Sequence, residues 1–277
     1  MHISANQYSP LPDNHHTLNI WKELSSISAE YHVFSRAKKN SFNTTNEGKI
    51  FLHLIPSLGK NQFSFFITSL LLIFYVKKLK PTHLIAQCPA LGGISATLCK
   101  FFFGTKLLVE IHGEHYFKSV KSGWRGTAHH LFFRFFAKFT LAKADKIRSL
   151  SSEMSNLLIE TYGEKLANKI VLVPNRVNLK IFNAPKATYK TGSALKIITV
   201  GSFVRGKNHI ELIHHLQKSK VNFELTLVGA GPLKDEYLTL ANSLDLGEKI
   251  IIRENLSHVE LSEVLRSSDI YIHYSLT

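Results

Sequence analysis

The chain has few cysteines, few acidic residues and no long uninterrupted apolar run, and each shortage excludes something. It holds two cysteines among 277 residues, Cys88 and Cys99, so the fold does not depend on a disulfide framework, and this usage fits a reducing compartment. The longest strongly apolar run, residues 63–76, is interrupted by polar residues and is shorter than the roughly 20 residues that span a bilayer. Polar residues follow Met1, so we expect no secretory signal peptide.

The shortage of acidic residues leaves the chain strongly basic. Lys and Arg number 34 against 20 Asp and Glu, which gives a formal net charge of +14. Such a surface attracts phosphates, whether in nucleic acid, in anionic lipid headgroups or in phosphorylated small molecules. Nucleic acid is the weakest of these candidates, because the sequence shows no recognition helix, zinc pattern or aromatic RNA-binding motif. We therefore expect no nucleic-acid partner.

Short apolar segments alternate with helical segments along the chain, which predicts an α/β fold of βαβ units with parallel sheets. In the first part we expect strands at residues 2–4, 31–34, 50–54, 83–86, 107–111, 146–150 and 170–173, and helices over 17–29, 62–80 and 126–144. In the second part we expect strands at residues 196–200, 223–228, 249–252 and 270–273. The pattern indicates two doubly wound, Rossmann-like domains.

A polar stretch with Pro and Gly separates the two parts and is predicted to be a linker. We expect a first domain over residues 1–184, the linker over 185–195 and a second domain over 196–277. Two such domains imply a cleft between them, and ligands of such sheets bind at the carboxyl ends of the strands.

Two strand-to-helix turns of the second part combine glycines with a lysine. The first runs from Gly201 to Lys207, and the second is Gly229-Ala230-Gly231. Glycine lets the backbone approach a ligand closely, and the N–H groups at a helix start bind phosphate oxygens. We therefore interpret the two turns as a cradle for a diphosphate.

Helix starts are indicated at three places in the second part. Asn208 with Glu211 and Ser257 with Glu260 have the spacing of a capping box. Pro232, directly after Gly231, suits the first position of a helix.

Five segments, in this order and spacing, resemble the retaining family-4 glycosyltransferases, which have the GT-B fold. They are Ala144-Asp145-Lys146-Ile147 leading to Ser151, Val173-Pro174-Asn175-Arg176-Val177-Asn178 with Phe182, Val200-Gly201 with Lys207, Gly229-Ala230-Gly231-Pro232, and Ser268-Asp269-Ile270-Tyr271 running to Ser275. The resemblance covers most of the chain. It implies transfer of a hexose, with retention, from a nucleotide-diphosphate sugar to a glycan or lipid-linked acceptor in cell-envelope polysaccharide or lipopolysaccharide synthesis. It implies no metal or other cofactor.

The resemblance also assigns residues to the donor site. Lys207 would contact the donor diphosphate, and Arg205 is a candidate second cation because Ser202 stands where many members have arginine. The remaining expected donor-binding residues are Gly201, Gly229, Gly231 and Leu256.

In the first part, the resemblance points to two further residues. His112 ends a strand in the pair His112-Gly113 and is the candidate catalytic residue, facing the donor sugar. Asn14 lies in the first strand-to-helix loop, on the acceptor side, where members commonly have a glycine pair that this chain lacks. Arg176 stands in place of another glycine of the family pattern.

An aromatic and basic segment, residues 131–139, allows two interpretations. Its five phenylalanines, with Arg134 and Lys138 one turn apart, are typical of a helix in a membrane interface. We favour a buried helix whose basic residues reach water. The net charge still favours attachment to an anionic membrane, so we expect a cytoplasmic protein or one that is peripheral on the inner face of the cell membrane.

In the family, a glutamate-rich motif, further strands and a final helix follow the segment that resembles residues 274–277. The resemblance therefore implies that the second domain is incomplete, that the enzyme is C-terminally truncated, and that this chain is inactive alone. One alternative is a non-catalytic nucleotide-diphosphate-binding or membrane-associated fragment. Another is a related enzyme that acts on nucleotide-sugars without transfer, such as an epimerase.

Overall fold

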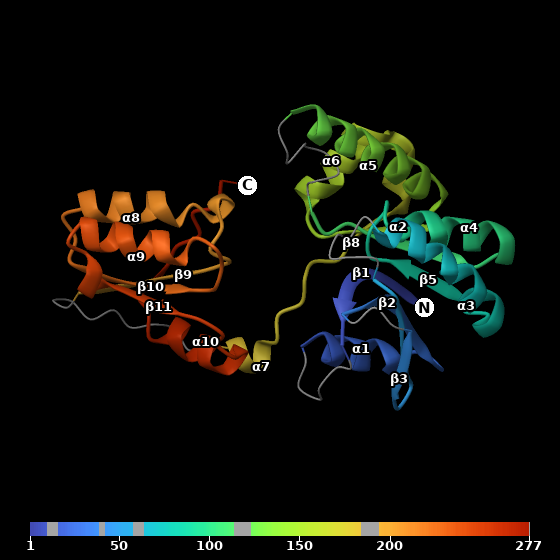
Figure 1. The fold of residues 1–277 in the computed structure, drawn as a ribbon, viewed down its shortest axis with the longest axis horizontal. Coiled ribbons are helices and arrows are strands. Elements are labelled where there is room, and N and C mark those ends of the chain that lie inside the picture. Colours follow the sequence, from blue (N-terminus) through green and yellow to red (C-terminus); the bar gives the residue numbers. More distant parts are fainter. Residues whose placement is uncertain (10–15, 39–41, 58–63, 114–122, 184–193, 277) are drawn as a thin grey trace. The chain divides into compact units, whose positions relative to one another are not determined.

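The computed structural model of the chain describes residues 1–9, 16–38, 42–57, 64–113, 123–183 and 194–276. It divides into two compact units, the first Met1–Asn175 and the second Arg176–Thr277, which Figure 1 colours from blue to yellow and from yellow to red. The predicted linker falls almost wholly on residues 184–193, which lie outside the described part. The predicted domain boundaries therefore stay a prediction.

An eight-stranded sheet forms the centre of the first unit. Its strands lie in the order β3-β4-β2-β1-β5-β6-β7-β8, and every neighbouring pair is parallel except β3 and β4. In chain order they are β1 (His2–Tyr8), β2 (Tyr31–Ala37), β3 (Asn43–Glu47), β4 (Ile50–Ile55), β5 (His83–Ala86), β6 (Lys106–Glu110), β7 (Lys146–Ser149) and β8 (Ile170–Leu172). All the strands predicted for this part are confirmed, and β3 is an additional strand.

Helices cover both faces of this sheet, as in a doubly wound fold (Figure 1). The crossover from β1 to β2 holds α1 (His16–Ser26). The crossovers from β4 to β8 run the other way across the sheet and hold α3 (Leu72–Leu79), α4 (Gly93–Phe103), α5 (Gly123–Lys143) and α6 (Ser152–Tyr162). Because such crossovers are right-handed, α1 lies on one face and the other four helices on the opposite face.

The helical stretch predicted over residues 62–80 is confirmed for the described residues 64–79, but the helix geometry changes within it. It consists of α2 (Ser64–Thr68), the 3₁₀ turn η1 (Ser69–Leu71) and α3. The hydroxyl of Ser69 donates to the carbonyl oxygens of Phe66 at 3.1 Å and Leu91 at 3.2 Å. A serine hydroxyl that bonds to a nearby carbonyl competes with the regular helix, which explains the change of geometry at this residue.

The second unit has a four-stranded parallel sheet in the order β11-β10-β9-β12. Its strands are β9 (Leu195–Val200), β10 (Phe223–Val228), β11 (Ile250–Arg253) and β12 (Ile270–Tyr271), and its helices are α7 (Leu179–Phe182), α8 (His209–Lys218), α9 (Lys234–Ser243) and α10 (His258–Arg266). Helices α8 and α9 lie on one face of the sheet and α10 on the other (Figure 1). The core between the sheet and α8 and α9 contains Phe203, Ile213, Leu225 and Tyr237.

Two predicted helix starts in this unit have different outcomes. The capping box at α10 is confirmed: the Glu260 backbone N–H donates to the Ser257 hydroxyl at 3.3 Å, and the Ser257 N–H donates to the Glu260 carboxylate at 2.7 Å. Pro232 is not the first residue of α9, which begins at Lys234. The residues before it form a turn, in which Lys234 N–H donates to the Gly231 carbonyl at 3.3 Å.

Candidate functional site

Three loops of the second unit begin at one edge of the sheet, because β9, β10 and β11 end in register. Val200 lies opposite Val228, and Val228 lies opposite Arg253. The hydrogen-bond ladder continues into the loops, where Gly201 N–H donates to the Val228 carbonyl at 2.9 Å and Gly229 N–H donates to the Arg253 carbonyl at 3.0 Å. The predicted glycines Gly201 and Gly229 are thus brought together at the carboxyl edge of the sheet.

Close packing of the two loops explains why glycine stands at positions 229 and 231. A Cβ atom on Gly229 would lie 2.0 Å from the Gly201 carbonyl oxygen, and one on Gly231 would lie 2.6 Å from the Phe203 carbonyl oxygen. A hydrogen bond of 2.9 Å from Phe203 N–H to the Ala230 carbonyl also joins the two loops. Only residues without a side chain let the two loops pack backbone against backbone. A ligand contact at these glycines stays a prediction.

Lys207 is held against the first of these glycines. It ends the 3₁₀ turn η4 (Arg205–Lys207), directly before α8. A Cβ atom on Gly201 would lie 3.3 Å from Lys207 Cδ, so the aliphatic part of the lysine passes over the glycine. We call the loops of residues 201–207 and 229–231 the two-loop cradle. Ser202 and Arg205 are exposed in the first of these loops.

The capping box predicted at Asn208 is wrong. Asn208 has the left-handed conformation, with φ 55° and ψ 32°, and its side chain makes no cap hydrogen bond. An N-cap residue normally has extended backbone angles, whereas asparagine tolerates the left-handed region and here turns the chain from η4 into α8. The first amides of α8 therefore have no side-chain cap from this residue, and they lie next to Lys207.

Further residues at this edge were not predicted. Lys234, the first residue of α9, forms an ion pair with Glu254, which directly follows β11. The spacing that could have revealed it is the same as for Lys207: a lysine at the helix start after a glycine loop. Leu256 is half-buried two residues beyond Glu254, after the left-handed Asn255.

The segment after β12 lies along the first loop of the cradle. Leu276 N–H donates to the Gly206 carbonyl at 3.1 Å, and the hydroxyl of Ser275 is 3.0 Å from Nε2 of His273. Buried His209 lies nearby, and its pKa is lowered by burial and by the charges of Lys207 and His273. His209 is therefore not a source of the positive charge at this edge, whereas Lys207 and Arg205 are.

In the first unit, His112 follows β6 and belongs to a charged cluster on the sheet. Its Nε2 atom lies 3.1 Å from the carboxylate of Glu110, and the same carboxylate accepts a hydrogen bond of 2.9 Å from Arg148. Arg148 also donates to the carbonyls of Val173 at 3.0 Å and Pro174 at 3.1 Å. The cluster therefore fixes the His112 ring and links it to the segment after β8.

The electrostatics of this cluster favour a charged Glu110. Burial alone would raise the pKa of Glu110, but the hydrogen bond from His112, the charges of His2 and His112 and the hydrogen bond from Arg148 lower it to about 2. Burial lowers the pKa of His2 to about 4, although the neighbouring Glu110 acts in the opposite direction. Glu110 and Arg148 were not predicted as site residues. Asn14 lies outside the described residues.

We expect the first unit to lose stability as the pH falls from 6.5 to 4. Because the pKa of His2 is lowered to about 4, the unfolded chain binds a proton in this range that the folded chain excludes. This difference corresponds to about 3 kcal/mol at pH 4. Urea unfolding followed by tryptophan fluorescence measures it, since Trp21 and Trp124 both lie in this unit.

The variant His2→Gln should make this decline shallower without abolishing it, because the pKa of His53 is also lowered to about 4 by burial and by His32 and Lys78. The exposed His83 provides the matched control, and His83→Gln should leave the decline unchanged. Glu110 adds to the loss of stability only below about pH 4.5, the pKa of its carboxyl group in the unfolded chain. The same slope in His2→Gln and in the original chain would contradict this prediction.

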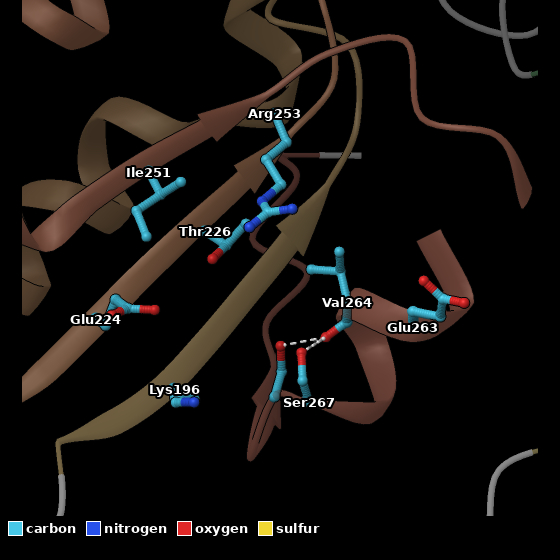
Figure 2. Close-up of a pocket in the computed structure, with 9 residues that line it drawn as sticks. Lys196, Glu224, Thr226, Ile251, Arg253, Glu263, Val264 and Ser267 are labelled. Atoms are coloured by element: carbon cyan, nitrogen blue, oxygen red, sulfur yellow. Dashed lines mark hydrogen bonds between the residues drawn. The ribbon is translucent and has the colours of Figure 1, made fainter. Parts of the chain in front are cut away.

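A groove of about 390 Å³ lies between α10 and the sheet of the second unit (Figure 2). It is lined by Lys196, Glu224, Thr226, Ile251, Arg253, Glu263, Val264, Ser267 and Ser268. Figure 2 shows the Arg253 side chain extending along the sheet beside Thr226. The Val264 carbonyl accepts hydrogen bonds from the hydroxyls of Ser267 at 2.9 Å and Ser268 at 2.8 Å. None of the predicted donor-binding residues lines the groove, although it adjoins the two-loop cradle at Arg253, whose carbonyl accepts the hydrogen bond from Gly229 N–H.

The part of the chain that the structure describes contains no cluster of three or more His, Cys, Asp or Glu side chains that could hold a metal ion. Among the same residues, no helix combines the length and the apolar composition that crossing a bilayer requires.

Comparison with known families covers almost the whole chain. Residues 14–181 match the family model described as Glycosyltransferase Family 4, and residues 182–277 match the model described as Glycosyl transferases group 1. The chain belongs to Glycosyltransferase Family 4, and its second part has the domain of glycosyl transferases group 1. A curated relative from Campylobacter jejuni, N-acetylgalactosamine-N,N'-diacetylbacillosaminyl-diphospho-undecaprenol 4-alpha-N-acetylgalactosaminyltransferase, is 41% identical over 56 residues. That match covers 20% of this chain and 15% of the relative.

Solved structures of low sequence identity share the fold. Sucrose-phosphate synthase from Thermosynechococcus elongatus has a TM-score of 0.76 at 16% identity, over 99% of this chain and 74% of its own. Anabaena HepE, solved in complex with UDP, has a TM-score of 0.68 at 11% identity, over 100% of this chain and 74% of its own. The predicted α/β fold of GT-B type is confirmed.

Proposed function

We propose that this glycosyltransferase moves a hexose from a nucleotide-diphosphate sugar to a glycan or lipid-linked acceptor, with retention, in the synthesis of a cell-envelope polysaccharide or lipopolysaccharide. The observation that carries the proposal is the two-loop cradle. Two glycine loops pack backbone against backbone at the carboxyl edge of the sheet, and Lys207 lies across Gly201 beside the start of α8. The carboxyl edge of a doubly wound sheet is where such folds bind their ligands.

The chemistry of the donor explains why this edge needs positive charge. The nucleotide-sugar bond breaks with departure of a diphosphate, so stabilising that anion is the main electrostatic task. In the proposed mechanism the Lys207 ammonium and the first amides of α8 receive the diphosphate oxygens. Position 202 is serine in this chain, so it supplies no guanidinium. We propose that Arg205, in the same loop, contacts the diphosphate as a second cation.

In the first unit, His112 is the proposed contact with the donor sugar. Its Nε2 atom is engaged by Glu110 at 3.1 Å, which leaves Nδ1 as the ring nitrogen that can face a ligand. Glu110 and Arg148 act as positioning residues, because Glu110 holds the His112 imidazole and Arg148 in turn holds the Glu110 carboxylate. We also propose that Leu256 contacts the donor and that Asn14 lies on the acceptor side.

Two relatives support the choice of substrates. The Campylobacter jejuni relative is named for transfer of N-acetylgalactosamine to a saccharide linked to diphospho-undecaprenol. Anabaena HepE was solved with UDP, and in another crystal with UDP and glucose. We therefore propose a uridine diphosphate sugar as the first donor to test and a lipid-linked saccharide as the first acceptor.

Titration calorimetry with UDP tests the donor site. The variant Lys207→Ala should bind UDP about 10- to 100-fold more weakly, because a hydrogen bond to a charged group contributes about 1.5–3 kcal/mol. Lys218, exposed at the last turn of α8, offers a matched control, and Lys218→Ala should bind normally. Equal UDP affinity of Lys207→Ala and the original chain would remove Lys207 from the site.

Transfer is tested separately, by incubating the chain with UDP-hexoses and a lipid-linked acceptor and analysing the product. Transfer with retained configuration supports the full proposal. UDP binding with no transfer to any acceptor agrees both with the expectation that this chain is inactive alone and with the alternative, a non-catalytic nucleotide-diphosphate-binding fragment. Conversion of the sugar nucleotide without an acceptor favours an epimerase-like activity.

A further inference from the structure

Large apolar side chains are exposed on the helical layer of the first unit. Phe74 of α3 is 68% exposed, Phe101 of α4 is 82% exposed, and Phe135 of α5 is 70% exposed. Single exposed apolar residues are ordinary on a soluble protein, but a group of them on neighbouring helices marks a binding surface. Helix α4 contacts both α3 and α5, so the three phenylalanines belong to one layer.

Helix α5 shows how this surface is built. Phe133 and Ala137 are buried in the core, which bears out part of the buried-helix interpretation. The opposite side of the same helix exposes Leu131, Phe135 and Phe139, at intervals of four residues. Arg134 and Lys138 are exposed between them. The outer side of α5 is therefore apolar and basic at once, rather than only basic.

The neighbouring helices continue this pattern. Ile67 of α2 and Leu70 of η1 are exposed on the same segment as Phe74. The ring of Phe66 in α2 lies 5.3 Å from that of Phe132 and 5.1 Å from that of Phe136, which joins α2 to α5. We call the outer side of α2, η1, α3, the end of α4 and α5 the aromatic-basic face.

Basic residues dominate the charge of this face, although Lys100 of α4 is paired with Asp145, which follows α5. The sequences of α2, α3, α4 and α5 contain no Asp or Glu, and Lys77 and Lys78 occupy the last turn of α3. Both of these lysines are exposed. Because α3, α4 and α5 each return from the carboxyl edge of the sheet to its amino edge, their C-terminal turns lie at the same edge. Exposed aromatic rings and cations thus occur together there.

We propose that the aromatic-basic face binds the surface of an anionic lipid bilayer. Phenylalanine and leucine side chains enter the boundary between headgroups and acyl chains, while the adjacent lysines and arginines contact lipid phosphates. A second copy of the chain fits this face poorly, because a two-fold interface would bring identical basic residues together. This inference does not depend on the proposed sugar transfer, and lipid binding is measured without any donor or acceptor.

Vesicle co-sedimentation of the full chain tests the proposal. We expect binding to vesicles of phosphatidylcholine with phosphatidylglycerol, weak binding to phosphatidylcholine alone, and a decrease in binding with added salt. The apolar variant Phe74→Ser/Phe101→Ser/Phe135→Ser and the charge variant Arg134→Glu/Lys138→Glu should each weaken binding about tenfold or more.

Matched controls come from exposed residues elsewhere. Ile27 and Val259 are 85% and 53% exposed, and Ile27→Ser/Val259→Ser should bind vesicles like the original chain. Lys218→Glu/Lys220→Glu reverses two exposed charges of the second unit and controls for net charge. Circular dichroism confirms that each variant is folded.

Three results would overturn the proposal. The first is no binding of the original chain to anionic vesicles at low salt. The second is equal weakening by the control and the face variants, which would indicate attraction by net charge alone. The third is a dimer in analytical ultracentrifugation, without lipid, that the apolar variant dissociates, because the face would then be covered by a second copy.

Discussion

Replacing Gly229 by alanine is expected to destabilise the second unit by about 3 kcal/mol, the upper range for overpacking a closely packed site. The new Cβ atom would lie 2.0 Å from the Gly201 carbonyl oxygen, which is backbone and cannot turn away as a flexible side chain would. The φ of Gly229 is 154°, which adds strain for any residue with a side chain. The clash is relieved only if the two loops separate. We therefore expect the variant to lose UDP binding as well as stability.

Hydrogen exchange of the amides of β9 and β10 measures this effect within the second unit. Tryptophan fluorescence should show an unchanged first unit, because both tryptophans lie there. Gly206 is the matched control: a Cβ atom there meets nothing within 4 Å, so Gly206→Ala should change stability little. Normal exchange protection in Gly229→Ala would show that the loops can move apart at little cost.

The variant Arg148→Met is expected to destabilise the first unit by about 3 kcal/mol, as breaking a largely buried ion pair usually does. The side chains of Arg148 and Glu110 are 18% and 12% exposed, so water cannot replace the lost guanidinium well. Without Arg148 the pKa of Glu110 should rise from about 2, because one of the hydrogen bonds that lowers it is gone.

Urea unfolding with tryptophan fluorescence measures this loss, and the double variant Glu110→Gln/Arg148→Met separates its causes. If the cost comes from an unpaired carboxylate, removing that carboxylate should recover part of the stability. The sum of the two single effects in the double variant would instead show that Arg148 acts through its contacts with Val173 and Pro174.

The regular part of the fold could be predicted from the sequence because buried parallel strands are apolar. Residues 83–86 and 223–228 were predicted as strands with the bounds that β5 and β10 have. Strand β3 was missed, because Asn43-Thr44-Thr45-Asn46-Glu47 has no apolar residue and is a strand only through its pairing with β4. Asn208 was misjudged for a related reason, since a capping pattern does not reveal backbone angles.

The candidate site could be predicted only where one loop contains it. Lys207 and Gly201 are six residues apart, so their proximity follows from a single turn. The pair of Glu110 and Arg148 depends on the register of β6 against β7, across 38 residues of sequence. Lys234 and Glu254 likewise meet only because β10 and β11 are neighbours in the sheet, so that the chain after each strand begins at the same edge. The sequence alone contains no information on such registers.

Strand β3 also limits how the first unit can associate with other chains. It forms one border of the eight-stranded sheet, where unpaired backbone groups would otherwise attract a foreign strand. Its side chains are polar and mostly exposed, and it runs against the direction of the other strands. Fibril-like growth by strand addition is therefore disfavoured along this border, despite the highly apolar strands behind it.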